Sequence, residues 1–293
     1  MAVIAMRDAL NQALREEMAR DQDVFIMGED IAVFEGSYKV TLNLLKEFGP
    51  KRVIDTPIAE EGFIGAGIGA AMMGLRPVVE IMTINFILVA MDQVVNHAAK
   101  THYMFGGEVR VPLTIRTPGG GGQQLTAQHS QSLEVMFAHV PGLKVVAPST
   151  PYDAKGMLKA AIRDDNPVMF IENITLYNTR GEVPEGDYLV PLDKADIKRP
   201  GKDITLIGHS KGAVLAMQAA ELLAAQGIEG WATYGISAEV SATIMEGAFD
   251  YLDAPVARIG GKEVPMPYSK PLEQAAIPTP EEVVALVHEV LGE

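Results

Sequence analysis

With 293 residues, 48% of them hydrophobic, the chain is long enough to bury one large core or two ordinary ones. Its net charge of -14, with no block of basic residues, argues against binding to nucleic acid or to an anionic membrane. The absence of cysteine excludes disulfide bonds, thiolate metal sites and a cysteine nucleophile, and it fits a reducing compartment.

The N-terminal residues predict neither a signal peptide nor a membrane span. Residues 1–4 lead directly into an amphipathic helix over residues 6–18, and no apolar run reaches the roughly 18 residues that a membrane span needs. We therefore expect a soluble, intracellular globular protein.

Predicted helices and short apolar strands alternate as far as residue 172. Apolar residues at helical spacing predict helices over residues 6–18, 38–48, 62–73, 88–100, 130–137 and 151–163. Short aliphatic runs predict strands over residues 24–27, 52–55, 77–82, 111–118, 143–147 and 167–172. This alternation is typical of a parallel sheet covered by helices on both faces.

Ligands of such sheets bind beyond the carboxyl ends of the strands. Five features fall at or just after those ends, namely Glu29, Glu60, Phe86, the glycine loop 119–122 and Glu172. We therefore expect the functional site to be built from these positions.

Residues 52–74 place Glu60 and Glu61 at the start of a glycine-rich apolar helix. Each glycine in a helix interior costs about 1 kcal/mol relative to alanine, so the helix backbone must gain from lying close to a neighbour. The spacing of residues 65–70 loosely matches a dinucleotide fingerprint, but the two carboxylates occupy the helix start where a pyrophosphate would bind. They suit a hydrogen-bond donor such as a ring nitrogen, or they simply cap the helix.

The alternation stops at residues 179–202, where prolines and glycines predict a linker between residues 1–178 and a second domain over residues 203–293. In the second domain the pattern predicts strands over 203–207 and 255–259 and helices over 212–225, 238–249 and 280–291. The stretch between the first two of these helices predicts no strand, so the second domain has few strands with which to form a sheet.

Two further patterns have a catalytic and a structural interpretation. Residues 208–212 match G-x-S-x-G around Ser210 between a strand and a helix, as in a serine hydrolase, although His288 in the last helix is the only downstream histidine. The alternative is an ordinary strand-to-helix turn. His129 directly follows the glycine loop, where it can act as an acid or base or make a structural hydrogen bond.

The known metal and phosphate motifs are missing from the sequence. It contains no HExxH, no CxxC and no Walker A loop. It also lacks the G-D-G pattern, followed by N-N, that holds magnesium diphosphate in thiamine enzymes.

Seven segments together resemble one family. They are GEDI at residue 28, GSYKVT at 36, RVIDTPIAEEGFIGAGIGAAMMGLRPVVEIMTINF at 52, MDQVVNHAAK at 91, AQHSQS at 127, HVPGLKVVAPSTPYDAKGMLKAAIRDDNPVMFIEN at 139 and APVARIGGKEVPMPYS at 254. The chain resembles the beta subunits of the thiamine-diphosphate-dependent component of 2-oxo acid dehydrogenase complexes, closest to the pyruvate type. The resemblance implies a transketolase-like pyrimidine-binding domain followed by a smaller α/β C-terminal domain.

The resemblance also assigns roles to individual residues. It implies that Glu60 hydrogen-bonds the pyrimidine ring of thiamine diphosphate, that Phe86 packs on that ring and that Glu29 lies near the same pocket. His129 matches an active-site histidine that assists the substrate or lipoyl reaction. Glu61 remains an acid at the helix start. In some relatives a structural potassium ion is bound at positions that match Leu113, Ala161, Asp164 and Asn166.

Family members carry the diphosphate motif on a separate alpha subunit, together with magnesium, so the resemblance implies a chain that is active only in an alpha2beta2 heterotetramer. It further implies docking onto a dihydrolipoyl acyltransferase core. The expected reaction is oxidative decarboxylation of pyruvate with transfer of the acyl group to a lipoyl domain. Branched-chain 2-oxo acid and acetoin dehydrogenases remain alternatives, as does a non-catalytic scaffold subunit.

One stretch departs from the family. Relatives carry a strand, a helix and a second strand, about thirty residues in all, between the helix that ends near Gln226 and the segment that matches GWATYGISAEV. Here residues 227–229 run directly into Gly230. We expect that such a segment is missing from the sequence near residues 228–230 and is present in the protein itself. A true deletion of central strands would leave the C-terminal sheet without partners.

Overall fold

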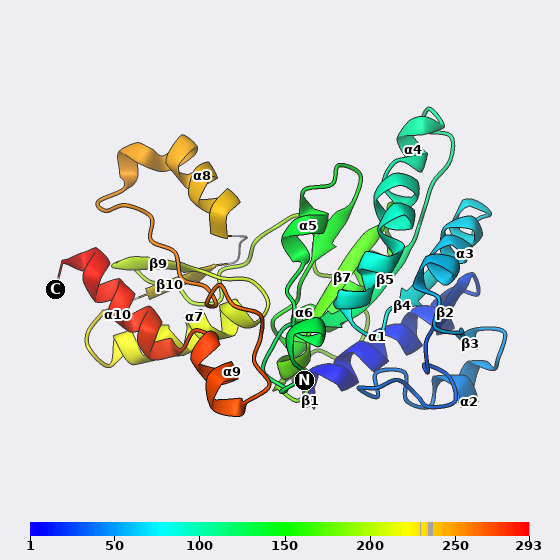
Figure 1. Cartoon of the computed structure of the whole chain (residues 1–293), viewed down its shortest axis with the longest axis horizontal. Helices are drawn as coiled ribbons and strands as arrows, with labels where there is room; N and C mark the ends of the chain where they lie inside the picture. The colour runs from blue at the N-terminus through cyan, green and yellow to red at the C-terminus, as the bar shows by residue number, and fades with distance from the viewer. Residues whose placement is uncertain (229, 234–236, 293) are drawn as a thin grey trace. The chain divides into compact units, whose positions relative to one another are not determined.

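The computed structural model describes residues 1–228, 230–233 and 237–292 (Figure 1). The chain forms two compact units. The first comprises Met1–Gln123 and Gln128–Leu192, and the second comprises Gln124–Ala127 and the chain from Asp193 onward.

The first unit contains a six-stranded parallel sheet in the order β3-β2-β4-β5-β7-β6. Its strands are β2 (Val24–Gly28), β3 (Val53–Asp55), β4 (Arg76–Glu80), β5 (Thr114–Gly119), β6 (Lys144–Val146) and β7 (Val168–Asn173). The predicted parallel α/β sheet is thus confirmed, and each of its strands lies within a few residues of the predicted one. Since β3 and β4 flank β2 on opposite sides, the strand order reverses at β2, and such a reversal is where ligands bind in open parallel sheets.

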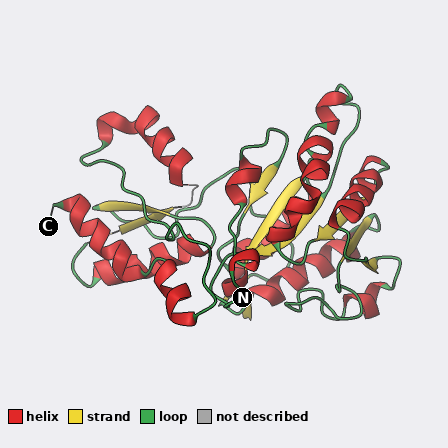
Figure 2. Ribbon diagram, in the orientation of Figure 1, coloured by secondary structure: helices red, strands yellow, loops and turns green. Residues whose placement is uncertain are grey.

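The helices of this unit lie beside the strands of the sheet (Figure 2). They are α1 (Met6–Arg20), α2 (Leu44–Phe48), α3 (Glu60–Met72), α4 (Thr101–Met104), α5 (Glu134–Ala138) and α6 (Pro151–Arg163). Short 3-10 and π segments complete the set, namely η1 (Ile84–Ala90), η2 (Gln93–Ala98), η3 (Ala127–His129) and η4 (Ile174–Leu176). Consecutive residues of a strand face opposite sides of a sheet, and both Val78 and Val79 are fully buried, so both faces of the sheet are covered.

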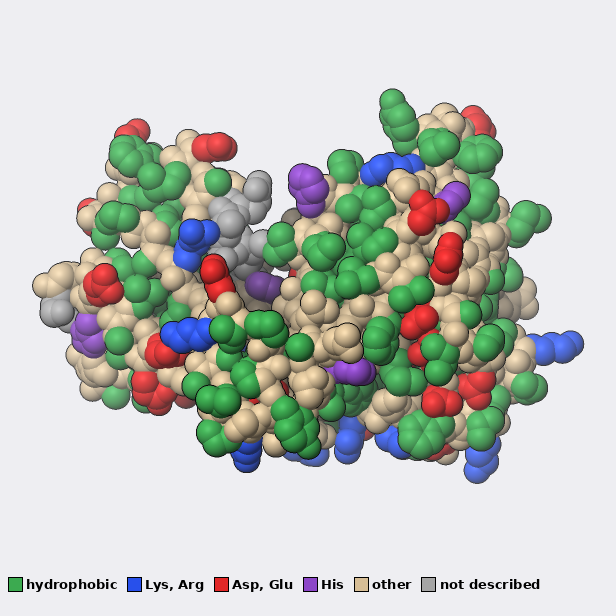
Figure 3. Space-filling view, in the orientation of Figure 1, with side chains coloured by type: hydrophobic (Ala, Val, Ile, Leu, Met, Phe, Trp, Pro, Cys, Tyr) green, Lys and Arg blue, Asp and Glu red, His purple; other side chains and the backbone are tan. Residues whose placement is uncertain are grey.

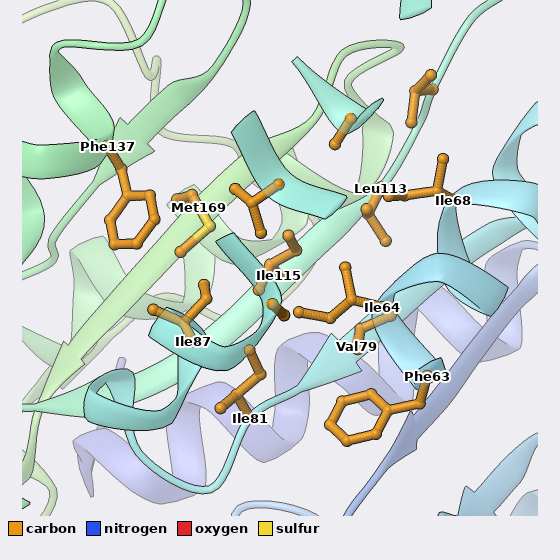
Figure 4. Packing of buried hydrophobic residues seen from close by; sticks show 14 of the residues in the cluster. Phe63, Ile64, Ile68, Val79, Ile81, Ile87, Leu113, Ile115, Phe137 and Met169 are labelled. Atoms are coloured by element: carbon orange, nitrogen blue, oxygen red, sulfur yellow. The ribbon is translucent and has the colours of Figure 1, made fainter. Parts of the chain in front are cut away.

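The core on one face of this sheet forms around α3 (Figure 4). Phe63, Ile64 and Ile68 of α3 pack with apolar residues of β4, β5 and β7. A Cβ atom at Gly67 would lie 2.7 Å from Cγ2 of Val79, so this glycine allows the helix backbone to approach the sheet. The expected close approach of the glycine-rich helix is therefore present at Gly67.

Three of the predicted helices differ in form or extent from the prediction. The range 88–100 predicted as one helix contains the end of η1 and the π segment η2, and the range 38–48 contains only the short helix α2 at its end. The range 130–137 is helical only from Glu134 onward, as α5. An additional antiparallel pair joins β1 (Ala2–Ala5) to β8 (Arg180–Val183), with Ala2 opposite Val183. Strand β8 thus uses the beginning of the range that the sequence predicts to be a linker.

The second unit contains a two-stranded parallel sheet of β9 (Ile204–Ile207) and β10 (Gly230–Thr233). Its helices are α7 (Lys211–Ala224), α8 (Ser237–Ala248), α9 (Lys270–Ala276) and α10 (Pro280–Leu291), with the 3-10 turn η5 (Phe249–Tyr251) after α8. Leu223, Ile228 and Val287 form its small described core. Within the described parts of the chain, no helix is long and apolar enough to cross a membrane.

The strand predicted over residues 255–259 is wrong, because this range is irregular in the structure. Pro255 lacks an amide hydrogen for a strand ladder, and the strand paired with β9 is β10, which the sequence pattern does not predict. The helix begun by Thr279 is confirmed as α10. The Thr279 side chain and the Glu282 side chain form a reciprocal capping box there.

Candidate active site

Two buried glutamates lie at the point where the strand order reverses. Glu29 directly follows β2, and Glu60 is the first residue of α3, which follows β3. Each is only 6% exposed. Strands β2 and β4 lie so close at this end that a Cβ atom at Gly28 would meet the carbonyl oxygen of Glu80 at 2.4 Å. Both acids therefore lie in the interior, at the edge of the sheet where the strands end.

The two glutamates interact electrostatically. Burial raises the pKa of Glu29 from 4.5 to about 7, and the negative charges of Glu60 and Asp30 add to that increase. Oε1 of Glu29 is buried and has no hydrogen-bond partner among the described residues. Glu29 therefore holds a proton close to neutral pH and has a free oxygen with which to accept or share one.

The loop that follows Glu29 is fixed by the end of β3. The Asp55 carboxylate accepts hydrogen bonds from the backbone N–H groups of Ala32 at 2.7 Å and Val33 at 3.1 Å. Asp30 adopts a left-handed backbone with φ of 54°, and its carbonyl accepts from the N–H of Gly36 at 2.8 Å. The backbone is thus fixed on both sides of Glu29, by strand β2 before it and by this hydrogen-bonded turn after it.

A second pair of predicted site residues is formed by Phe86 and His129. Phe86 lies in η1 and is half-buried, whereas His129 ends η3 and is exposed. The two rings meet edge to face, with centroids 5.2 Å apart and planes at 90°. The structure thus pairs the aromatic residue with the histidine that follows the glycine loop.

A buried ionic network lies across the same strand ends, and the sequence reasoning missed it. Arg116 of β5 is 1% exposed and donates to Glu80 of β4 and, at 2.5 Å, to Glu172 of β7. The Tyr177 hydroxyl donates to the same Glu172 oxygen at 2.6 Å, and Tyr38 stacks on Tyr177 at 4.8 Å. Burial would lower the pKa of Arg116, but the two carboxylates raise it above its ordinary value, so Arg116 stays charged.

A signal for this network was present in the sequence. An arginine inside an otherwise apolar strand needs buried acidic partners, and glutamates stand at the ends of both neighbouring strands. Because β4 and β7 flank β5, these residues are neighbours once the strand order is known.

Comparisons with known proteins agree with this architecture. The family described as "Transketolase, pyrimidine binding domain" matches residues 2–179, and "Transketolase, C-terminal domain" matches residues 193–230 and 228–283. The chain is 47% identical to the pyruvate dehydrogenase E1 component subunit beta of Rhizobium meliloti, covering 99% of this chain and 70% of that protein. It is 45% identical to the corresponding subunit of Rickettsia bellii, covering 98% of each chain.

The chain belongs to the family of pyruvate dehydrogenase E1 component beta subunits. A mitochondrial member from Caenorhabditis elegans is 45% identical, covering 99% of this chain and 93% of that protein. Among solved structures, a chain titled "Split gene transketolase, inactive beta4 tetramer" aligns with a TM-score of 0.77 over 99% of both chains, at 19% identity. This likeness confirms the transketolase-like fold.

Family membership leaves the serine hydrolase alternative without support. Ser210 is buried, with φ of 50° and ψ of -127° at the turn into α7. A Cβ atom at Gly208 would lie within 2.6 Å of the Gly212 backbone, so the turn is tight. His288, the histidine that the hydrolase interpretation needs, lies in α10 with Nε2 2.7 Å from the Gln226 side-chain oxygen. Tight packing of the turn accounts for the sequence pattern.

The four positions that match the family's potassium ligands gather around the turn after α6. The Leu113 carbonyl accepts from the N–H of Val168 at 2.9 Å, and the Ala161 carbonyl accepts from the N–H of Asp164 at 3.2 Å. Oδ1 of Asp164 accepts from both the backbone and side-chain nitrogens of Asn166, each at 2.9 Å.

Two cationic side chains of the chain itself also reach this turn. The Lys144 ammonium pairs with Oδ2 of Asp164, and Arg76 donates to the Ile162 and Asp164 carbonyls, both at 3.1 Å. Burial would raise the pKa of Asp164, but the hydrogen bonds from Lys144 and Asn166 outweigh it and lower the pKa. A potassium ion here would share the Asp164 carboxylate with Lys144, while each carbonyl keeps a second lone pair.

The family comparison also bears on the segment near residues 228–230. The C-terminal family matches in two pieces that meet at 228–230, and the alignment to the Rhizobium meliloti subunit runs over 323 positions, more than the 293 residues of this chain. The connection through Glu229, on which the predicted gap depends, lies outside the described residues.

Proposed function

We propose that this chain supplies the pyrimidine-binding half of a pyruvate dehydrogenase E1 active site. The observation that carries the proposal is the pair of buried acids Glu29 and Glu60, one of which has a free buried oxygen and a pKa of about 7. An aminopyrimidine offers ring nitrogens and an amino group, which can donate to or share protons with such carboxyls. The residues present therefore fit the pyrimidine end of thiamine diphosphate.

Glu60 would hydrogen-bond a ring nitrogen of the pyrimidine, and Glu29 would lie beside it as a second proton carrier. Thiamine diphosphate, when bound, supplies a carbon nucleophile and electron sink for decarboxylation of a 2-oxo acid. The contribution of Glu60 is to hold a proton at the ring, in a buried position where the hydrogen bond is strong.

Phe86 and His129 would complete the site from the neighbouring segments. The half-buried ring of Phe86 would pack on the pyrimidine, and the exposed ring of His129 would donate or accept a proton at the substrate or at a lipoyl group. An exposed histidine at a strand end suits a reactant that arrives from solvent or from a partner protein.

The diphosphate end of the cofactor would be held by an alpha subunit, with magnesium, in an alpha2beta2 assembly. The visible surface carries many hydrophobic side chains between acidic and basic ones (Figure 3). On the loops beside Glu29 and Glu60, Val33, Phe34 and Ile58 are 81%, 55% and 82% exposed. We take these exposed apolar side chains, which lie on loops next to the two acids, as support for a subunit interface there. A dihydrolipoyl acyltransferase core is the expected further partner.

The favoured substrate is pyruvate, because relatives that are 45% to 47% identical to this chain are named as pyruvate dehydrogenase subunits. The same relatives include bacterial and mitochondrial proteins, and we propose the bacterial cytoplasm or an organelle matrix as the compartment. Turnover of pyruvate, 2-oxoisovalerate and acetoin by the chain reconstituted with its cognate alpha subunit would separate the three substrate classes.

The deciding experiment replaces Glu60 by Gln in that reconstituted assembly. We expect turnover to fall about 100-fold or more, since general acid-base groups contribute about that much. Glu61→Gln is the matched control, because Glu61 is the next residue of the same helix start but is exposed. Full turnover by Glu60→Gln would indicate a scaffold subunit. Decarboxylation by the chain alone would contradict the need for an alpha subunit.

We also propose that the turn formed by residues 161–166 binds potassium through the Leu113, Ala161 and Asn166 backbones and the Asp164 carboxylate. Potassium should then raise the melting temperature of the chain more than sodium does at equal ionic strength. In Asp164→Asn, the difference between the two ions should shrink. Equal melting temperatures in the two salts would show that potassium does not bind at Asp164.

For the segment near residues 228–230, we propose that the natural protein contains the strand, helix and strand found in relatives. The intact mass of the protein isolated from its source tests this proposal. A mass of 31.5 kDa would show that the shorter chain is the natural one, and a larger mass would show that a segment is absent from the sequence.

A further inference from the structure

Phe86 and His129 lie on separate segments, and the side chain of Asn85 joins those segments. Oδ1 of Asn85 accepts a hydrogen bond from the backbone N–H of Gln131 at 3.1 Å, two residues beyond His129. Nδ2 of Asn85 donates to Oγ1 of Thr83 at 2.6 Å. The Asn85 side chain is only 5% exposed, so water competes little for either bond.

The backbone of Gln131 is held from both sides. Its N–H donates to Asn85, and its carbonyl accepts from the N–H of Gly120 at 2.9 Å. A Cβ atom at Gly119 would lie 2.8 Å from Cγ2 of Ile84, which is the residue before Asn85. The glycine loop, the start of η1 and the His129 segment therefore form one clamp.

The orientation of the Asn85 amide is set by Thr83. Because Nδ2 donates to the Thr83 hydroxyl, the amide oxygen faces Gln131. His129 itself is exposed and lies in a single 3-10 turn, Ala127–His129, which has little stability of its own. Its ring contact with Phe86 thus depends on how the segment is anchored beyond the turn.

We propose that Asn85 is a positioning residue that holds the imidazole of His129 against Phe86 and fixes where His129 meets the substrate. The proposal rests on the function proposed above for Phe86 and His129. In this proposal the hydrogen bond from the Gln131 N–H to Asn85 does more than stabilise the fold, because it sets the position of the His129 ring in the site. A displacement of about 1 Å in a catalytic group can lower a rate about 100-fold.

The first test reads the position of His129 directly, in the full chain, by NMR of ¹³C-labelled histidine. The edge-to-face contact places His129 in the ring current of Phe86, and Phe86→Leu gives the reference shift without that ring. We expect Asn85→Ala to move the His129 signal toward this reference. Asn85→Asp should keep the signal near the wild-type position, because a carboxylate oxygen still accepts from Gln131 and the Thr83 hydroxyl can donate in return.

Thr101→Val is the matched control for lost stability. The Thr101 hydroxyl is also buried and hydrogen-bonded, to the His97 carbonyl at 2.7 Å, but it lies outside this clamp. Thr101→Val should lower the melting temperature and leave the His129 signal in place. Should Asn85→Ala not fold, Thr83→Val carries the same test, because it removes only the acceptor that orients the Asn85 amide.

The second test uses the assembly reconstituted with the alpha subunit. We expect Asn85→Ala to lower kcat about 10-fold or more with a smaller change in the Kd of thiamine diphosphate by calorimetry, and Asn85→Asp to restore most of the rate. A wild-type His129 signal in a folded Asn85→Ala chain would overturn the proposal. Since that signal is measured without turnover, it judges the role of Asn85 even if the Glu60 experiment contradicts decarboxylation.

Discussion

Replacing Glu29 by Gln should stabilise the isolated chain at neutral and alkaline pH. Glu29 is 6% exposed, and its pKa rises from 4.5 to about 7, first because of burial and then because of the charges of Glu60 and Asp30. Ionisation of Glu29 in the folded chain is therefore unfavourable, and a neutral amide of nearly the same shape removes that cost.

The size and sign of the effect follow from the two pKa values. One pKa unit corresponds to about 1.4 kcal/mol, so the shift of Glu29 is equivalent to about 3 kcal/mol. The folded chain binds the Glu29 proton more tightly than the unfolded chain does. The stability that Glu29 contributes therefore falls as the pH rises from 4.5 to about 7, and the loss is complete above that range. Below pH 4.5 the carboxyl is protonated in both states, and the variant should match the wild type.

Urea unfolding followed by circular dichroism at a series of pH values would measure the difference between Glu29→Gln and the wild type. Titrating groups distant from Glu29 affect both chains alike, so they cancel in this difference. Glu61→Gln serves as the control, since it removes an exposed charge from the start of α3. If the free energy of unfolding of Glu29→Gln relative to wild type does not rise between pH 4.5 and 7, the pKa of Glu29 is not raised by burial.

Two further substitutions test the packing around the site. Arg116→Met should lower the free energy of unfolding by about 3–5 kcal/mol in urea titrations, because it leaves two buried carboxylates without their cation; a loss below about 1 kcal/mol would contradict the buried network. Gly142→Ala should be severely destabilising, since φ is +100° and the added Cβ would lie 2.0 Å from the Ala99 carbonyl oxygen. Gly186→Ala, with φ of +86° and nothing within 4 Å, should cost only about 1–2 kcal/mol of backbone strain, and equal melting temperatures for the two alanine variants would refute the clash.

The sheet of the first unit could be predicted from the sequence because two signals agree. Strands such as Val24–Gly28 and Val168–Asn173 are short aliphatic runs, and helices with one apolar face separate them. The order of the strands could not be predicted in this way, since side-chain periodicity is the same at the edge and in the centre of a parallel sheet. Strand β8 was missed for a related reason, because Arg180–Val183 contains charged residues and becomes a strand only by pairing with β1.

The type of helix in these segments, whether α, 3-10 or π, also could not be predicted from the sequence pattern. The apolar residues of the range 88–100 fit a single helix by spacing, yet the structure has the end of the 3-10 segment Ile84–Ala90 and the π segment Gln93–Ala98 there. Over one or two turns, the three kinds of helix place nearly the same residues on one face, so periodicity does not separate them. The difference bears on the proposed site, because η1 carries both Asn85 and Phe86.

Four candidate site residues could be located from strand ends and from the family resemblance, namely Glu29, Glu60, Phe86 and His129. Their pairing could not, because it depends on which strands are neighbours and on how loops are pinned. Asn85 shows this limit, since its partner Gln131 lies on another segment and the bond involves only the Gln131 backbone. No side-chain pattern in the sequence marks a backbone partner.

At the edge where the strands end, two glutamates are paired with a buried cation and two are not. This difference favours a ligand that donates hydrogen bonds to the second pair. Glu80 and Glu172 share the guanidinium of Arg116, which satisfies both with one buried cation. Among the ion pairs of the described residues, none involves Glu29 or Glu60. A cation at these acids would lower the pKa of Glu29, whereas burial and neighbouring acids raise it. A phosphate would add to that repulsion, whereas a ring with hydrogens to donate would not, so these two acids favour the proposed pyrimidine end of the cofactor over its anionic end.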